Sequence, residues 1–316
     1  MSVFTPLERE PLEAFLAPYG LGRLVHFQGI AEGSENSNFF VSLERGEFVL
    51  TLVERGPSGD LPFFIELLDV LHAAGLPVPY ALRSDAGEAL RELAGKPALL
   101  QPRLPGRHVH APNAHHCAEV GDLLARLHLA TRGQILERPS DRGLDWMLAE
   151  GPARAARLDA TTRPLLEAAL AEIAALGERV RGLPRANLHA DLFRDNVLFD
   201  GAHLAGLIDF YNACSGPMLY DLAICLNDWC SAADGRLEPA HAHALLGAYA
   251  ARRPFGAAEA ELWPALLRIA CVRFWLSRQI AADAFAGQDV LIHDPDEFLR
   301  RLAQRQRVEI PLPFAL

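Results

Sequence analysis

A short polar segment in the second half of the chain combines residue types that can do chemistry. Residues 187–199 have the sequence NLHADLFRDNVLF, which places His189, Asp191 and Asn196 in a loop that leads into an apolar strand. A second apolar segment, GLIDF, follows and contains Asp209. Aspartate and asparagine are common in turns, but an H-x-D-x-x-x-x-N spacing followed by I-D-F is a composite pattern that turn chemistry alone does not explain.

This set of side chains is suited to phosphoryl transfer from a nucleotide. The reaction needs a carboxylate that orients an attacking hydroxyl and accepts its proton. It also needs oxygen ligands that hold Mg²⁺ on the nucleotide phosphates. The pattern therefore predicts Asp191 as the catalytic base and Asn196 and Asp209 as the magnesium ligands, with ATP as the co-substrate.

The elements that must position this loop differ between the two halves of the chain. In the first half, short segments rich in β-branched and aromatic residues alternate with Gly, Ser and Asn, which is typical of an antiparallel meander. A helical apolar pattern then ends at Gly75, just before Pro77 and Pro79. We expect a short leading helix, strands over 23–30, 37–43 and 47–53, a helix over 61–74, and strands near 80–83 and 97–101.

From about residue 106 the pattern changes to long helical segments dominated by alanine and leucine. The predicted fold class is α+β and bilobal, with a small antiparallel β lobe and a larger, mainly helical lobe. We place a nucleotide-binding lobe at 1–102 and a catalytic and substrate lobe at 103–316, with the Pro-Gly stretch 101–106 as the hinge. Helices are expected over 113–130, 161–181, 239–252, 257–285 and 295–307, and a strand-and-loop insert over 186–211.

The composition narrows the class of protein. Lys and Arg number 30 against 40 Asp and Glu, and this net charge of −10 argues against a nucleic-acid partner. The five cysteines include no C-x-x-C pair, which fits a reducing compartment. No segment approaches the ~18 uninterrupted apolar residues of a membrane span. We therefore expect a cytoplasmic protein with no membrane partner, and the composition leaves its oligomeric state open.

Two further segments resemble motifs of the aminoglycoside phosphotransferase and choline kinase group of protein-kinase-like enzymes. Residues 121–128, GDLLARLH, are similar to a family helix that ends in L-x-x-L-H, and residues 216–223, GPMLYDLA, are similar to its G-P-x-x-Y-D-L-A helix start. The likeness extends over nearly the whole chain and is greatest to the bacterial homoserine kinase branch. It implies a two-lobed kinase-like fold and transfer of a phosphoryl group from Mg·ATP to an alcohol.

The resemblance also implies roles for single residues. The matching positions imply Asp191 as the base, Asn196 and Asp209 as magnesium ligands, and His189 as the support of the catalytic loop. They imply Asp221 as a structural anchor. We expect the same of Asp221 from its position, because an aspartate near a helix N-terminus can accept hydrogen bonds from free amides.

The nucleotide is expected on the first half of the chain. Residues 29–38, GIAEGSENSN, lie between the first two predicted strands, where the kinase-like fold places its nucleotide-covering loop. Small polar residues let backbone amides approach phosphate oxygens, although an ordinary hairpin turn has a similar composition. The expected ATP-binding residues are Gly29, Gly33, Ser34, Asn36, Glu66 and Gln101.

One position departs from the kinase pattern. The third strand should carry a phosphate-contacting lysine in a V-A-I-K motif, but the sequence there is VLTLV, with Thr51 at the aligned position. The lysine that would pair with Glu66 is therefore missing. Either another cation such as Arg55 reaches the phosphates, or the enzyme relies on the metal and backbone amides, or the chain has lost activity. The homoserine kinase branch is itself similar in having V-L-T-L here.

The acceptor is predicted less directly than the chemistry. The resemblance implies L-homoserine, phosphorylated to O-phospho-L-homoserine in threonine biosynthesis. The alternatives are choline, an aminoglycoside or another amino alcohol, and, in another class, a non-catalytic nucleotide-binding regulator. Residues 263–281 contain no acidic residue, which argues against a polycationic aminoglycoside. Candidates for contacting the ammonium and carboxylate of an amino acid are Asp195, Asp228, Arg194 and Arg273.

Overall fold

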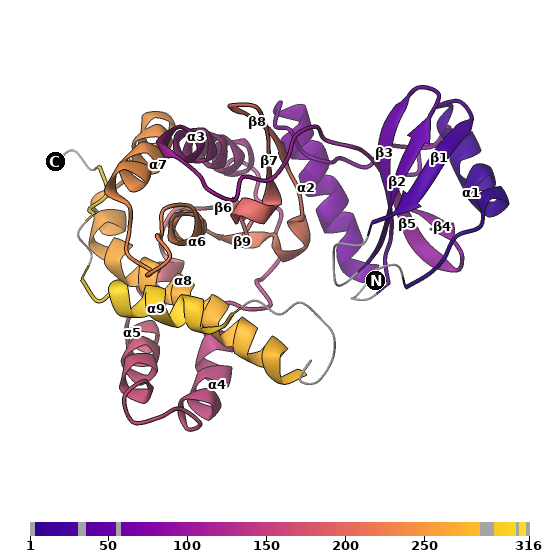
Figure 1. Ribbon diagram of the computed structural model, residues 1–316. Coiled ribbons are helices and arrows are strands. Elements are labelled where there is room, and N and C mark those ends of the chain that lie inside the picture. Colours follow the sequence, from indigo (N-terminus) through magenta and orange to yellow (C-terminus); the bar gives the residue numbers. More distant parts are fainter. Residues whose placement is uncertain (1–3, 31–35, 55–57, 285–293, 308–309, 314–316) are drawn as a thin grey trace. The chain divides into compact units, whose positions relative to one another are not determined.

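The computed structural model describes residues 4–30, 36–54, 58–284, 294–307 and 310–313 (Figure 1). The chain divides into two compact units. The first comprises residues 1–106 together with 205–208, and the second comprises 107–204 and 209–316. We call them the sheet unit and the helical unit.

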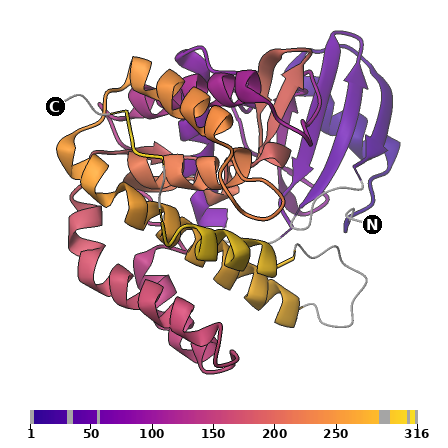
Figure 2. The same ribbon diagram turned by 60° about the vertical axis from the view of Figure 1, so that its left-hand side comes forward.

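The sheet unit is built on an antiparallel sheet of five strands in the order β1-β2-β3-β5-β4 (Figures 1 and 2). Neighbouring strands follow the chain closely, with Phe39 opposite Leu50 and Val49 opposite Gln101. Residues alternate between buried and partly buried along β2, as expected for a sheet with one face on a core. The strands are β1 (Leu24–Gly29), β2 (Ser37–Leu43), β3 (Gly46–Leu52), β4 (Arg91–Leu93) and β5 (Lys96–Pro102), and the helices are α1 (Arg9–Leu16) and α2 (Leu61–Ala73).

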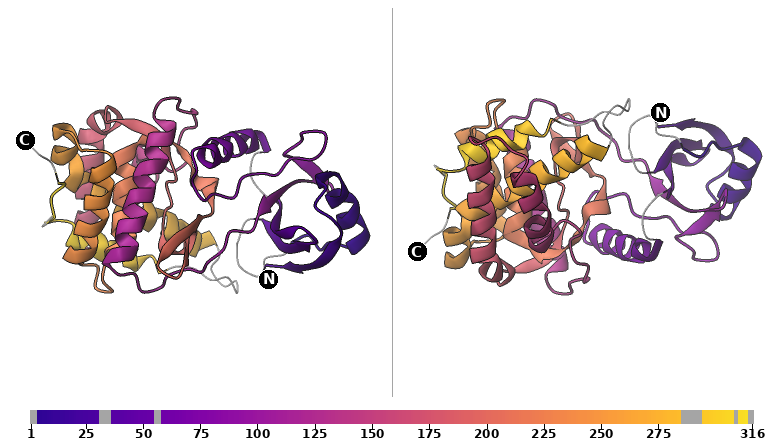
Figure 3. Two further views of the ribbon diagram at one scale, coloured as in Figure 1. Left: turned by 90° about the horizontal axis from the view of Figure 1, so that it is seen from above. Right: turned by 90° about the horizontal axis from the view of Figure 1, so that it is seen from below.

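Helix α1 covers one face of this sheet, as both views of Figure 3 show. Its residues Leu12, Phe15 and Leu16 are buried in one apolar cluster with strand residues such as Val41 and Leu50. Full burial of a Leu or Phe side chain is worth about 1.5–3 kcal/mol, so these contacts hold the leading helix on the sheet.

The helical unit is organised around α6, whose residues from Met218 to Trp229 are all buried. Helices α3, α7 and α8 pack against it, as Figure 1 shows, and α9 packs on α8. Within the described residues, no helix is long and apolar enough to cross a membrane. The helices are α3 (Ala114–Thr131), α4 (Leu144–Ala155), α5 (Arg163–Arg181), α6 (Met218–Trp229), α7 (Pro239–Arg252), α8 (Ala257–Ala284) and α9 (Asp296–Gln304), and the strands are β6 (Arg185–Leu188), β7 (Val197–Asp200) and β9 (Cys214–Pro217). Strand β8 (His203–Leu207) begins in this unit, and its residues from Ala205 onward are counted with the sheet unit.

Two glycines allow helices of this unit to approach closely. A Cβ atom on Gly121 of α3 would lie 2.2 Å from the backbone oxygen of Leu245 on α7. A Cβ atom on Gly151 of α4 would lie 2.5 Å from Cδ2 of Leu170 on α5. Both distances are far below contact distance, so the absence of a side chain permits both helix pairs.

The α+β, two-unit fold predicted from the sequence is confirmed, with two local corrections. The strand expected near 80–83 is wrong, because Leu82 makes a single backbone hydrogen bond to Leu100 and the fourth strand lies at Arg91–Leu93 instead. Helix α4 was not predicted at all. It contains Gly151 and Pro152, a pair that usually ends a helix, but Pro152 is accommodated inside α4.

Candidate active site

The loop that follows β6 is hydrogen-bonded to the buried carboxylate of Asp221. Both oxygens of Asp221, on α6, accept backbone hydrogen bonds from this loop, one from His189 N and one from Ala190 N, each at 2.8 Å. Ala190 has φ = 60°, a left-handed conformation that costs a residue with a Cβ atom about 1–2 kcal/mol. The hydrogen bonds to Asp221 offset this strain and fix the backbone directly before Asp191.

Asp221 is itself anchored by a buried polar chain. Its Oδ2 atom lies 3.1 Å from Nε2 of His128, and Nδ1 of His128 lies 2.8 Å from the Tyr249 hydroxyl. Burial alone would raise the pKa of Asp221, but the hydrogen bond and charge of His128 outweigh it and hold that pKa below its ordinary value. The expected anchor is therefore present, but it binds a loop about 30 residues earlier instead of capping its own helix.

Asp191 is fixed on both its backbone and its side chain. Its carbonyl oxygen accepts a hydrogen bond of 2.8 Å from the side-chain amide of Asn196, and its Oδ2 accepts one of 3.0 Å from the side-chain amide of Asn212. Burial raises the pKa of the Asp191 carboxyl, against the opposing effect of the Arg273 charge. A carboxylate held this way keeps Oδ1 for a further partner and is a stronger proton acceptor than an exposed aspartate.

Asn196 and Asp209 offer oxygen atoms of the kind that Mg²⁺ prefers. The Asn196 amide nitrogen is used on Asp191, which leaves its amide oxygen for a cation. Asp209 is exposed and has a left-handed backbone, with φ = 61° and ψ = 68°. Backbone strain of this kind collects at functional sites. This donor set of one carboxylate and one amide oxygen fits a magnesium ion that arrives with nucleotide phosphates.

His189 and Trp229 support the same loop through their rings. His189 is fully buried, and its ring centroid lies 4.5 Å from that of Phe210, the residue after Asp209. The Trp229 indole on α6 donates a hydrogen bond of 3.1 Å to the carbonyl of Leu192. The loop is thus packed on apolar rings and held by polar contacts at the same time.

Asn212 was missed by sequence reasoning, although it links two of the candidate residues. Its amide nitrogen donates to Asp191, and its amide oxygen accepts a hydrogen bond of 3.1 Å from the Arg273 guanidinium on α8. Nothing in the sequence signals this link, because 61 residues separate Asn212 from Arg273.

The other residues that were expected to contact the phosphoryl acceptor lie in different surroundings. The Arg194 guanidinium forms a forked contact with Asp228, at 3.1 and 3.2 Å, so these two candidates neutralise each other. Arg301 also reaches Asp228, at 3.5 Å. Asp195 is exposed on the same short turn as Arg194. The structure therefore brings Arg194 and Asp228 into a structural ion pair and does not bring Asp195 into it.

The residues expected to bind the nucleotide on the sheet unit are only partly described. Gly29 ends β1, and Asn36 is buried, with its side-chain oxygen accepting a hydrogen bond of 3.1 Å from Glu54 N. Gln101 on β5 donates to the Pro79 carbonyl, and Glu66 is exposed on α2. The expected residues Gly33 and Ser34 lie outside the described part of the chain, as does Arg55.

The position of the missing lysine is filled by a neutral contact. Thr51 on β3 is buried, and its hydroxyl donates a hydrogen bond of 2.7 Å to the Asn38 side chain. Lys96, the only lysine in the sequence, begins β5 and forms an ion pair with Glu54, just beyond the end of β3. This Lys–Glu pair was not anticipated, because both of its members lie off the kinase pattern.

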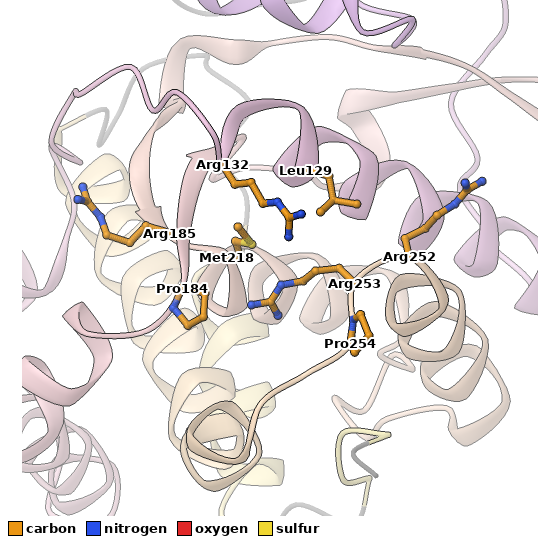
Figure 4. Close-up of a pocket in the computed structure, with 8 residues that line it drawn as sticks. All are labelled: Leu129, Arg132, Pro184, Arg185, Met218, Arg252, Arg253 and Pro254. Carbon is orange, nitrogen blue, oxygen red and sulfur yellow. The ribbon is translucent and has the colours of Figure 1, made fainter.

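A separate cavity of about 600 Å³ opens in the helical unit at the ends of α3 and α7 (Figure 4). Four arginines contribute to its lining, and three of them pair with carboxylates: Arg185 with Glu137, Arg252 with Asp122 and Arg253 with Glu259. None of the residues expected from the sequence to act in the site lines this cavity.

Comparison with known proteins identifies the family. The model of a family described as "Phosphotransferase enzyme family" matches residues 26–255. The chain belongs to this phosphotransferase family. Among its members, the chain is 78% identical over 316 residues to a homoserine kinase of Pseudomonas aeruginosa (strain UCBPP-PA14), with 100% of both chains covered. It is 44% identical over 281 residues to a homoserine kinase of Methylobacillus flagellatus, covering 88% of this chain and 86% of the relative.

Solved structures show that the phosphotransferase fold is shared much more widely than the sequence. A putative aminoglycoside phosphotransferase from Ralstonia eutropha JMP134 superposes with a TM-score of 0.71 at 15% identity, covering 95% of this chain and 97% of the other. A spectinomycin phosphotransferase in complex with ADP and spectinomycin gives a TM-score of 0.64 at 12% identity, covering 96% and 94%. At these identities the likeness establishes the fold alone.

Proposed function

We propose that this chain is a homoserine kinase that transfers the γ-phosphoryl group of ATP to the hydroxyl of L-homoserine, giving O-phospho-L-homoserine and ADP. Phosphoryl transfer is supported by the loop geometry and by membership in the phosphotransferase family. The acceptor is supported by the full-length identity of 78% to a homoserine kinase. The reaction is a step of threonine biosynthesis.

The observation that carries the mechanism is the fixed carboxylate of Asp191. Asn212 occupies its Oδ2, and the strained backbone before it is pinned by Asp221. The acceptor hydroxyl donates a hydrogen bond to the remaining oxygen, Oδ1, which orients the hydroxyl for in-line attack and takes up its proton as the bond to phosphorus forms. Burial favours this role, because a raised pKa makes the Asp191 carboxylate a better proton acceptor.

Asn196 and Asp209 are the residues that would hold Mg²⁺ on the nucleotide phosphates. When bound, the ion offsets the negative charge of the transferred oxygens. Asn196 also fixes the backbone of Asp191 through its amide nitrogen, so one side chain serves both the base and the metal position. The nucleotide is assigned to the sheet unit, at the β1–β2 connection that Gly29 and Asn36 flank.

A coupled assay of ADP release tests the proposal. Purified protein is given Mg·ATP with L-homoserine, choline, hydroxylysine, kanamycin or no acceptor. We expect turnover with L-homoserine far above that with the other acceptors. Preference for another alcohol would support phosphoryl transfer but reject L-homoserine as the acceptor. If none of the acceptors supports ADP release, the kinase assignment is rejected.

A further inference from the structure

Arg273 is a buried cation that forms no ion pair within the described part of the chain. Its exposed fraction is 3%, and its guanidinium donates one side-chain hydrogen bond, to Asn212. The guanidinium carbon also lies 4.0 Å from the centre of the Phe274 ring. One amide oxygen and one ring leave most of the five N–H groups of this side chain without an acceptor among the described residues.

Other buried arginines of the helical unit are better compensated. Arg253 forms an ion pair of 2.6 Å with Glu259, and Arg301 forms one of 2.5 Å with Glu297. Arg305 donates to three oxygens, those of Asn227, Gly235 and Ser231. The counter-charge that acts on Arg273 is Asp191, which is linked to it only through the Asn212 amide. Because a buried charge that lacks a directly paired carboxylate is costly, Arg273 has the environment of a residue that can take an anionic partner from outside the chain.

The position of Arg273 relates this charge to the proposed base. The Asn212 amide lies between the two groups, with its oxygen on Arg273 and its nitrogen on Asp191. This spacer keeps the guanidinium from closing directly onto the carboxylate, which would neutralise the base. A second positive charge, that of Arg142, is close enough to act on both Asp191 and Arg273. Arg194 is not available for the same role, because Asp228 occupies its fork.

We infer that Arg273 is a specificity-determining residue that binds the carboxylate of the acceptor, so that this site takes an alcohol carrying an acidic group several bonds from its hydroxyl. The inference rests on the proposed function, because it assigns one group of the homoserine substrate to one residue. A planar guanidinium matches a carboxylate with two parallel hydrogen bonds. With the carboxylate at Arg273 and the hydroxyl at Asp191, the two ends of the acceptor are fixed on either side of Asn212. A polycationic acceptor would instead meet a positive charge.

A cycle of two enzymes and two substrates tests this assignment. The wild type and Arg273→Gln are each assayed with L-homoserine and with 3-aminopropan-1-ol, which is the same molecule without its carboxylate. Removing one partner of a buried charged pair typically weakens an interaction by about 100-fold or more. We therefore expect Arg273→Gln to lower kcat/KM for L-homoserine by about 100-fold and to change kcat/KM for 3-aminopropan-1-ol by less than about threefold.

The matched control lies on the same helix. Arg268 of α8 has its own carboxylate partner, with Arg268 Nη2 at 2.5 Å from Glu172, so Arg268→Gln removes an arginine from α8 without touching the proposed site. It should leave the ratio of the two kcat/KM values at its wild-type level. Arg273→Lys keeps the charge but loses the fork and should show a smaller, equally selective loss. If Arg273→Gln does not give a cooperative unfolding transition, and is therefore not folded, Arg273→Lys is used in its place.

The outcomes separate the two proposals. If the wild type does not phosphorylate L-homoserine, the proposed function fails, whatever the variants do. If the wild type is active but the Arg273 variants lose the same factor on both substrates, Arg273 has only a structural role and the inference is overturned. Retention of full activity on L-homoserine by Arg273→Gln would overturn it as well.

Discussion

The catalytic loop of the helical unit and the end of β3 in the sheet unit solve the same problem in different ways. Each holds polar groups in a fixed place. The loop does so with Asp221, a fully buried carboxylate that binds two backbone amides and His128. The end of β3 does so with the neutral Thr51–Asn38 contact and with the Lys96–Glu54 pair, whose lysine is 34% exposed.

The difference shows where charge is indispensable in this protein. The Asp221 carboxylate is fully buried, so it is stabilised by its hydrogen-bond partners and not by water. Loss of one of these partners should therefore cost a large part of the stabilisation of the loop. Water compensates in part for a lost contact at the Lys96–Glu54 pair, because its lysine is partly exposed. We therefore expect substitutions in the loop to have large effects and substitutions at the end of β3 to have small ones, and the following variants test that ranking.

The largest effect on activity is expected at Asp191. Asp191→Asn keeps the shape and can still contact Asn212, but it cannot accept the proton of the acceptor. We expect kcat to fall by about 10²–10⁴-fold, the usual contribution of a general base. Because burial already disfavours the charged Asp191, stability to urea should be unchanged or higher. Unaltered ATP-dependent turnover would refute the assignment of Asp191 as the base. The expected difference in activity between substitutions in the loop and at the end of β3 would then be lost.

The largest effect on stability is expected at Asp221. Asp221→Ala leaves the amides of His189 and Ala190 and the ring of His128 without their acceptor, in a place that water does not reach. We expect a loss of about 3–5 kcal/mol in the free energy of unfolding, measured by urea denaturation. Asp234→Ala is the control, because that aspartate is exposed and pairs locally with Arg236. A cost no larger than that of the control would mean that the loop is not held by this carboxylate.

The ionisation of Asp221 adds a pH dependence to the same comparison. Burial opposes its charge, but the His128 contacts prevail, so the pKa of Asp221 is lower in the folded than in the unfolded protein. Its contribution to stability is therefore complete above the unfolded pKa and is lost as the pH falls through the folded one. The difference in unfolding free energy between the wild type and Asp221→Asn should be constant near neutral pH and shrink below about pH 4. A difference that grows in acid would contradict this.

The sequence locates the loop between β6 and β7 because the information is local, and the roles of its residues stay predictions. His189, Asp191 and Asn196 lie within eight positions, and phosphoryl transfer asks for those types at that spacing. The partners of these residues are not local. Asn212 accepts a hydrogen bond from Arg273 on α8, and the Arg194 guanidinium pairs with Asp228 on α6. These partners are far apart in the sequence, so no periodic pattern predicts either contact.

The secondary structure was predicted where a long helical pattern dominated a local break signal and missed where the helix with such a signal was short. Helix α8 contains Pro264, but its helical pattern continues on both sides of that residue over 28 residues, and the helix was expected over almost its observed length. Helix α4 was missed because Gly151 and Pro152 signal a break, whereas Gly151 serves the close packing against Leu170. Burial against a neighbouring helix outweighs local propensity there, and that burial is a property of the fold.

A smaller effect is expected at Lys96. The hydrogen bonds from Lys96 and Ser37 outweigh burial and hold the pKa of Glu54 below its ordinary value. Lys96→Met leaves a carboxylate that is only 5% exposed with Ser37 as a remaining partner, at 2.5 Å. We expect a loss of about 1–3 kcal/mol in the urea-derived unfolding free energy and little change in kcat. If kcat instead fell by more than tenfold in a folded variant, the sheet unit would also contribute an essential charge, and the proposed ranking would be wrong.

The smallest effect is expected at Thr51, where kinases with the V-A-I-K motif carry a charge. Thr51→Val keeps the shape of the side chain and removes the hydroxyl that donates to Asn38. A single neutral hydrogen bond is worth about 1 kcal/mol, so the urea midpoint should fall slightly and the KM for ATP should stay within about twofold of the wild-type value. A large rise in KM would place the Thr51 hydroxyl on the nucleotide. The unchanged KM that we expect would instead mean that ATP binding does not depend on the Thr51 hydroxyl, so that this side chain is dispensable in a way that Asp221 is not.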